Sequence, residues 1–257
     1  MGYPAAIAFV LLAMFAAAAL SYSVHRLVHV EARRRHQEVG VTVFLQLGVL
    51  FAVLLAFVFS QAYSEYGDAQ RAIDLECGAL HGTAMLAGSL PPAEAHDLLG
   101  LEANYLRNVV DGDWPSMRQH RRGSRDAMLA LTQLLQRVAR VPISGTVDVA
   151  IKSQLLSLLA TAHAEREVRL FEAGNGLPGV VWLVLFGYSI ILITFVAFSG
   201  LEQPQALMLF ALTLVACIGA TLVLVRLLDY PFEGPLAIPP TDFASRLAMV
   251  LDLLHAQ

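Results

Sequence analysis

Few residues of this sequence have the type and spacing that chemistry requires. His25 and His29 lie four positions apart, so on a helix they can share one face as metal or haem ligands. The same spacing suits a solvated helix beside a membrane, and no third ligand accompanies them. The sequence contains no glycine-rich nucleotide motif, no HExxH, no GxSxG and no paired-cysteine zinc motif. We therefore expect no enzymatic activity, no catalytic residue, no metal site and no cofactor.

Carboxylates just beyond the second apolar run offer a different chemistry, the attraction of cations. Glu65 and Asp68 are followed by Asp74 and Glu76. If several subunits surround an axis, such side chains form a negatively charged ring at the mouth of a pore. The alternative is an ordinary solvated helix surface. Glu65 and Asp68 are our pore candidates in this segment.

Three further pore or gate candidates lie inside the second apolar run. Phe44 and Phe51 are seven residues apart and share a helical stripe with Val58. Such a stripe can gate a pore by dewetting, and it can equally pack against lipid or another helix. Gln46 carries an amide that needs a partner in hydrocarbon. We predict that Phe51 and Gln46 face protein or an axial path rather than lipid.

The elements that must position these residues are membrane helices. Of the 257 residues, 57% are hydrophobic and 15% are charged, whereas a soluble domain averages about 25% charged residues. Apolar runs of this length indicate membrane helices, and the sequence contains four of them: Pro4–Val24, Val41–Ala62, Leu177–Ser199 and Ala206–Val225. We predict an all-α fold with four transmembrane helices and an extramembrane helical bundle inserted between the second and the third.

The expected domains follow from these runs. Residues 1–62 form the first two transmembrane helices with a basic connecting loop, and residues 63–173 form the helical bundle. Residues 174–228 form a hairpin of the third and fourth transmembrane helices. Residues 229–257 form a proline-rich tail with a short terminal helix that Asp242 can cap.

Local signals divide the bundle into helices. Ser124 is a candidate N-cap, and the sequence from Asp111 to Pro115 predicts the end of one helix and a turn. Four arginines follow this turn and could hold an anion or a lipid phosphate, or could form a solvated loop; they are Arg118, Arg121, Arg122 and Arg125.

The tail after the fourth run combines charge, proline and an aromatic residue. Arg226 can pair with Asp229, three residues further on. Pro231 ends the helix, and Phe232 is too apolar to lie in water, so we expect it to pack against the bundle. We assign this segment the role of a structural strap, made by Arg226, Asp229, Pro231, Phe232, Gly234 and Pro235.

Several short motifs in a fixed order resemble the bestrophin-like family of bacterial multi-pass membrane proteins, long known as a domain of unknown function. They are the basic loop ending in RRRHQEV, the triplet Asp113-Trp114-Pro115, the link Gly200-Leu201-Glu202, and the segment from Asp229 to Pro235. The resemblance covers nearly the whole chain and implies an oligomeric ion channel. It assigns no residue of this sequence to a pore.

Two functions from different classes remain open, an oligomeric ion channel and a non-catalytic membrane subunit or scaffold of a larger complex. The expected partners are membrane lipid and either further copies of the chain or other membrane subunits. The net charge of −4 gives no reason to expect nucleic acid. We expect a location in the bacterial inner (plasma) membrane. The arginine loop after the first run favours a periplasmic bundle and periplasmic termini, whereas true bestrophins place their large helical region in the cytoplasm.

Overall fold

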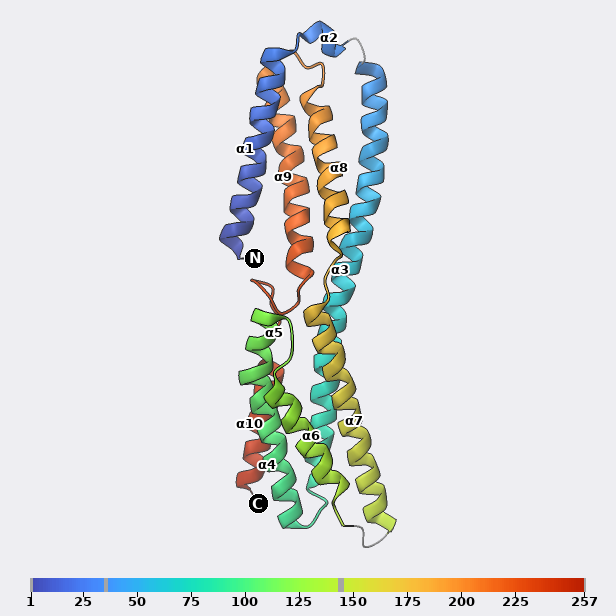
Figure 1. The fold of residues 1–257 in the computed structure, drawn as a ribbon, viewed down its shortest axis with the longest axis vertical. Helices are drawn as coiled ribbons and strands as arrows, with labels where there is room; N and C mark the ends of the chain where they lie inside the picture. Colours follow the sequence, from blue (N-terminus) through green and yellow to red (C-terminus); the bar gives the residue numbers. More distant parts are fainter. Residues whose placement is uncertain (1, 35–36, 143–145, 257) are drawn as a thin grey trace. The chain divides into compact units, whose positions relative to one another are not determined.

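The computed structural model describes residues 2–34, 37–142 and 146–256, and every regular element in these ranges is a helix (Figure 1). The chain divides into two compact units. The membrane unit comprises Met1–Ser64 and Leu177–Asp229, and the bundle unit comprises Glu65–Gly176 and Tyr230–Gln257. The predicted all-α fold with four membrane helices is confirmed.

The membrane unit is built from α1 (Tyr3–Leu27), the short α2 (Val30–Arg34), the first part of α3 (Gln37–Ala87), α8 (Gly179–Ala197) and α9 (Pro204–Leu228). Helix α1 packs against α8 and α9, which also pack against each other. Small residues permit this approach. Gly219 of α9 is buried, and a Cβ there would lie 3.3 Å from the Val10 side chain of α1.

The bundle unit contains the remainder of α3 and six further helical elements. These are α4 (Pro92–Asn108), the π-helix η1 (Val109–Asp113), α5 (Trp114–His120), α6 (Arg125–Ala139), α7 (Thr146–Gly174) and α10 (Thr241–His255). Helix α4 packs against α6 and α10, and α6 packs against α7. Apolar side chains at helical spacing meet in one core, which includes Leu80, Leu98, Leu106, Leu134, Leu155 and Phe243.

The ends of these helices show which local predictions succeed. Ser124 is the N-cap of α6, because its hydroxyl accepts the Ala127 backbone N–H at 3.2 Å, as predicted. The predicted turn at Trp114-Pro115 is wrong: η1 continues directly into α5, and Pro115 lies in the first turn of that helix. The predicted cap at Asp242 is also wrong, because α10 begins at Thr241 and Asp242 lies inside its first turn.

The proline-rich segment 230–240 lies in the bundle unit, where it folds back on itself. The Ile238 N–H donates to the Pro231 carbonyl at 2.8 Å, and Gly234 turns the chain with a φ of 76°, which favours glycine. The Phe232 ring is 3% exposed and meets Trp114 edge-on, with the ring centroids 5.6 Å apart. The Trp114 indole also donates to the Ile238 carbonyl at 2.9 Å.

We predict that Phe232→Ala destabilises the bundle unit by about 3–5 kcal/mol, because it empties a buried aromatic site beside Trp114. Thermal unfolding of the purified protein should show a clear fall in Tm. Phe171, which is 62% exposed in the same unit, provides the control, since Phe171→Ala should change stability by only about 0.5 kcal/mol. Equal melting temperatures for Phe232→Ala and the parent chain would contradict the packing role of Phe232.

Candidate functional site

The first set of candidate residues lies on α3 in the membrane unit. Phe51 is buried and stacks on Tyr188 of α8, with the ring centroids 6.1 Å apart. Phe44 lies half-buried one heptad earlier, 6.4 Å from the ring of Phe195, also on α8. These two aromatic rings therefore fix the face of α3 that meets α8.

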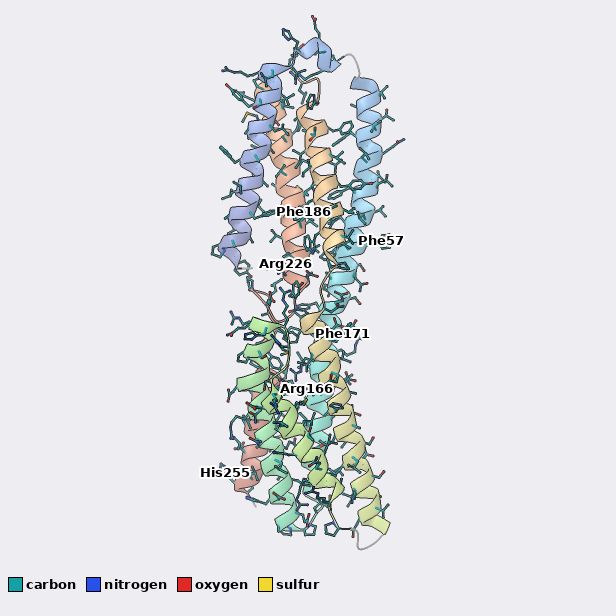
Figure 2. The ribbon with its side chains drawn as sticks, viewed as in Figure 1. Phe57, Arg166, Phe171, Phe186, Arg226 and His255 are labelled. Carbon is teal, nitrogen blue, oxygen red and sulfur yellow. The ribbon has the colours of Figure 1, made fainter. Side chains whose placement is uncertain are left out.

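Gln46 lies on a different face of α3, where it is exposed. Val49, Val53 and Phe57 follow it at helical spacing and are 64%, 51% and 72% exposed. Figure 2 labels Phe57 on this helix. Because two positions along a helix are about 200° apart, Gln46 cannot share one face with Phe44. The three candidates of the membrane unit are thus divided between an internal contact and an outer face.

The second set is acidic and lies in the bundle unit. Glu65 and Asp68 of α3 are both half-buried, and Asp68 pairs with Arg71 at 2.7 Å. The structure adds Glu172 of α7, which is 8% exposed and close enough to interact with the charges of Glu65 and Asp68. In the part of the chain that the structure describes, Glu172 Oε2 is buried without a hydrogen-bond partner. Three carboxylates from two helices therefore converge, and sequence analysis missed Glu172.

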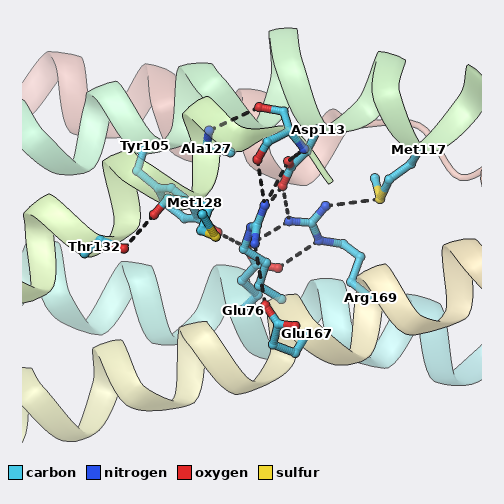
Figure 3. Close-up of polar contacts among 11 residues, drawn as sticks. Glu76, Tyr105, Asp113, Met117, Ala127, Met128, Thr132, Glu167 and Arg169 are labelled. Carbon is cyan, nitrogen blue, oxygen red and sulfur yellow. Dashed lines mark hydrogen bonds and ion pairs between the residues drawn. The ribbon is translucent and has the colours of Figure 1, made fainter. Parts of the chain in front are cut away.

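A buried ionic cluster lies at the centre of the bundle unit (Figure 3). The Arg169 side chain from α7 is fully buried. Its Nε donates to Glu76 Oε2 of α3 at 2.9 Å, and its Nη2 donates to Asp113 Oδ2 of η1 at 3.1 Å. One guanidinium therefore holds two carboxylates from two other elements.

Asp113 connects this cluster to the start of α6. Arg166, one turn before Arg169, donates from Nη2 to Asp113 Oδ1 at 3.0 Å and from Nε to Oδ2 at 3.1 Å. The Ser124 backbone N–H donates to the same Oδ1 at 2.7 Å. The Asp113 carboxylate thus accepts from α7 with both oxygens and orients the residue that caps α6.

Tyr105 of α4 completes the cluster by donating its hydroxyl to Glu76 Oε1 at 2.5 Å. Burial, followed by the negative charge of Glu76, raises the pKa of Tyr105 well above its ordinary value. The phenol therefore remains a hydrogen-bond donor. The cluster contains two arginines and two carboxylates, so its formal charges cancel.

The position of Glu76 corrects one expectation and explains one omission. Glu76 belongs neither to a solvated surface nor to a pore mouth, because its side chain is completely buried. Sequence analysis missed Arg166 and Arg169 as core residues. A signal was present, since both continue the buried stripe of α7 that begins with Leu155 and Leu159.

The four arginines near residue 120 lie on the surface. Arg121 donates to Glu233 Oε1 at 2.5 Å, and its guanidinium lies 3.6 Å from the centre of the Tyr230 ring. The hydrogen bond to Glu233 is the main cause that raises the pKa of Arg121. This arginine therefore binds the proline-rich segment, whereas Arg118, Arg122 and Arg125 are exposed.

Metal or haem ligation by His25 and His29 finds no support in the geometry. Within the described ranges, no group of three or more His, Cys, Asp or Glu side chains is arranged to hold a metal ion. His25 Nδ1 instead lies 3.3 Å from Arg33 Nη2.

We predict that Arg169→Gln destabilises the bundle unit by about 3–5 kcal/mol, because it leaves the buried Glu76 without its counterion. Arg137→Gln is the matched control. Arg137 also contacts two carboxylates, Glu94 and Asp97, but its side chain is 27% exposed, and such pairs contribute about 0–1 kcal/mol. In chemical unfolding, the free energy of unfolding of Arg169→Gln should be far lower than that of Arg137→Gln. Equal losses of this free energy would show that burial of the cluster does not affect stability.

Comparison with known proteins identifies solved structures that have the same helical membrane fold. A bacterial bestrophin homologue from Klebsiella pneumoniae, in a point-substituted form, superposes with a TM-score of 0.75 at 13% identity, covering 95% of this chain and 99% of that chain. The form of this homologue solved by zinc phasing gives a TM-score of 0.72 at 16% identity, covering 96% and 98%. No curated protein matches the sequence. The sequence matches the Bestrophin-like domain over residues 10–243, and the chain is therefore a membrane protein of the Bestrophin-like family.

Proposed function

We propose that the protein is an oligomeric ion channel of the bacterial inner membrane, in which α3 of each subunit lines a central path. Membership of the Bestrophin-like family and the likeness to bestrophin homologues support this proposal. The observation that carries it is Gln46, an amide exposed among apolar side chains in a membrane helix.

The outer face of α3 has the properties of a pore wall. An amide in hydrocarbon needs a polar partner, and Gln46 is exposed on the isolated chain. A ring of such amides around water provides that partner. Val53 and Phe57 follow on the same face and form an apolar constriction that can close by dewetting. Phe44 and Phe51 contribute indirectly, because their packing on α8 orients this face.

The acidic set in the bundle unit favours cations. Glu65, Asp68 and Glu172 bring three carboxylates together, and the exposed Arg71 pairs with Asp68. Repeated in each subunit, the set lowers the energy of a cation and raises that of an anion. We therefore propose cation selectivity, with Glu65 and Asp68 as the selectivity residues and Glu172 as a third member.

We predict that the purified protein forms a homo-oligomer and conducts small monovalent cations in liposomes. Glu65→Gln combined with Asp68→Asn should reduce the preference for K⁺ over Cl⁻ several-fold. Phe57→Ala should increase flux by widening the constriction, and Gln46→Leu should decrease it. Asp252→Asn, which removes an exposed carboxylate of α10, should change none of these values.

The oligomer and flux measurements also distinguish an ion channel from the alternative function, a non-catalytic subunit of a larger membrane complex. A verified oligomer without flux above empty liposomes would contradict the channel. Isolation of a single copy bound to other proteins would instead favour a subunit of a larger membrane complex. The mass of the oligomer must therefore be measured on the sample used for flux.

For the orientation, we propose a periplasmic bundle unit, because Arg26 in the last turn of α1 and Arg33 and Arg34 in the short connection after it are basic, and short basic connections remain in the cytoplasm. In a chain whose native cysteines are replaced by serine, an impermeant thiol reagent should label Ser153→Cys of α7 in spheroplasts. Gln203→Cys, in the link between α8 and α9, should be labelled only after lysis. The reverse pattern would place the bundle unit in the cytoplasm.

A further inference from the structure

The membrane unit contains a cavity of about 730 Å³ near the ends of its helices. Residues from α2, the start of α3, the end of α8, the link between α8 and α9, and residues 210–217 of α9 line it. Its wall is mainly aromatic and aliphatic, with Phe44, Phe195, Phe198, Phe210 and Leu214. Phe198 and Phe210 are 47% and 55% exposed, so the wall reaches the outer surface of the unit. The volume lies within the range of about 300–1,000 Å³ that is typical of ligand pockets.

A buried cation, Arg33 of α2, forms the polar part of this wall. Its side chain is almost fully buried at 6% exposure. Arg33 Nη1 donates to the Ser199 carbonyl at 2.9 Å, and Nη2 lies 3.3 Å from His25 Nδ1. Among the described residues, its Nε has no hydrogen-bond partner and no carboxylate lies within ion-pair distance.

The neighbouring Arg34 shows how differently an exposed arginine is satisfied. Arg34 pairs with Glu202 at 2.8 Å, and both side chains are more than half exposed. Among the residues that the structure describes, Arg33 contacts only a carbonyl and an imidazole, although a buried charge is ordinarily paired. The described wall of the cavity therefore carries a positive charge at one point of an otherwise apolar surface.

We propose that this cavity binds an acyl chain of an anionic phospholipid whose phosphate pairs with Arg33. The apolar wall requires a hydrocarbon chain, and the buried guanidinium requires an anion, so one molecule must carry both. A phospholipid of the surrounding bilayer meets this requirement, because basic pockets between membrane helices bind anionic headgroups. A free phosphate would leave the apolar wall uncovered, and a zwitterionic lipid would bring its own cation to Arg33.

The bound lipid would hold together the two connecting segments at this end of the membrane unit, one between α1 and α3 and one between α8 and α9. Arg33 belongs to the connection between α1 and α3, and Ser199 begins the connection between α8 and α9. A phosphate that shares Arg33 with the Ser199 carbonyl would hold both connections at one point. This role does not depend on ion conduction, so its test stands apart from the flux experiment.

Native mass spectrometry of the detergent-purified full chain can test the site. The protein is incubated with equal amounts of phosphatidylglycerol and phosphatidylcholine, and the retained lipid is counted per subunit. The parent chain and Arg34→Gln should retain phosphatidylglycerol in several-fold excess over phosphatidylcholine. Arg33→Gln should lose this excess. Equal retention by Arg33→Gln and Arg34→Gln would overturn the proposal, as would equal retention of both lipids by the parent chain.

A second variant tests the cavity while Arg33 is present. Cys217 is an exposed residue of α9 that lines the cavity, so Cys217→Trp should fill part of the space and reduce the retained phosphatidylglycerol several-fold. Unchanged retention in Cys217→Trp would show that the acyl chain lies elsewhere and would overturn the site. A competition experiment distinguishes a lipid phosphate from free phosphate as the anion at Arg33. Inorganic phosphate should not displace the bound lipid, and displacement by inorganic phosphate alone would also overturn the proposal.

Discussion

The ion pair between Arg169 and Glu76 is the constraint around which the bundle unit is built. Both side chains are completely buried, and charges removed from water are tolerated only when their hydrogen bonds are complete. The pair therefore fixes α7 against α3, and Asp113 adds η1 to the same point. Asp113 lies at the end of this π-helix, where it and Val109, one turn earlier, are both buried.

Trp114 contacts both the ionic cluster and the C-terminal part of the chain. The Arg169 guanidinium lies 5.1 Å from the Trp114 ring, a distance at which a cation and an aromatic face attract each other. The same indole binds the Ile238 carbonyl and contacts Phe232 and Phe243. The proline-rich segment and α10 are thus held by the residue that follows Asp113 directly. The short helix α10 and a segment without regular structure thereby gain a defined position.

The membrane unit is stabilised differently. Hydrocarbon offers no hydrophobic force between helices, so close packing of small residues must hold them, as Gly219 does against Val10. Two polar groups depart from this pattern. Gln46 is exposed on an apolar helix face, and Arg33 is buried beside an apolar cavity. We propose a partner outside the chain for each of them, a second subunit around water for Gln46 and a lipid phosphate for Arg33.

The sequence alone was sufficient for the membrane helices, the all-helical class, the cap at Ser124 and the family. These follow from apolar run length, from the chemistry of one hydroxyl beside free N–H groups, and from short motifs in order. It could not show which polar residues enter the core. Glu76 resembled its exposed neighbours, and its partner Arg169 lies 93 residues away. Glu172 likewise joins Glu65 and Asp68 only when α7 meets α3. Helical periodicity places a side chain on a face, whereas its charge partner is decided by tertiary packing, because a buried charge is tolerated only where distant segments supply its counterion.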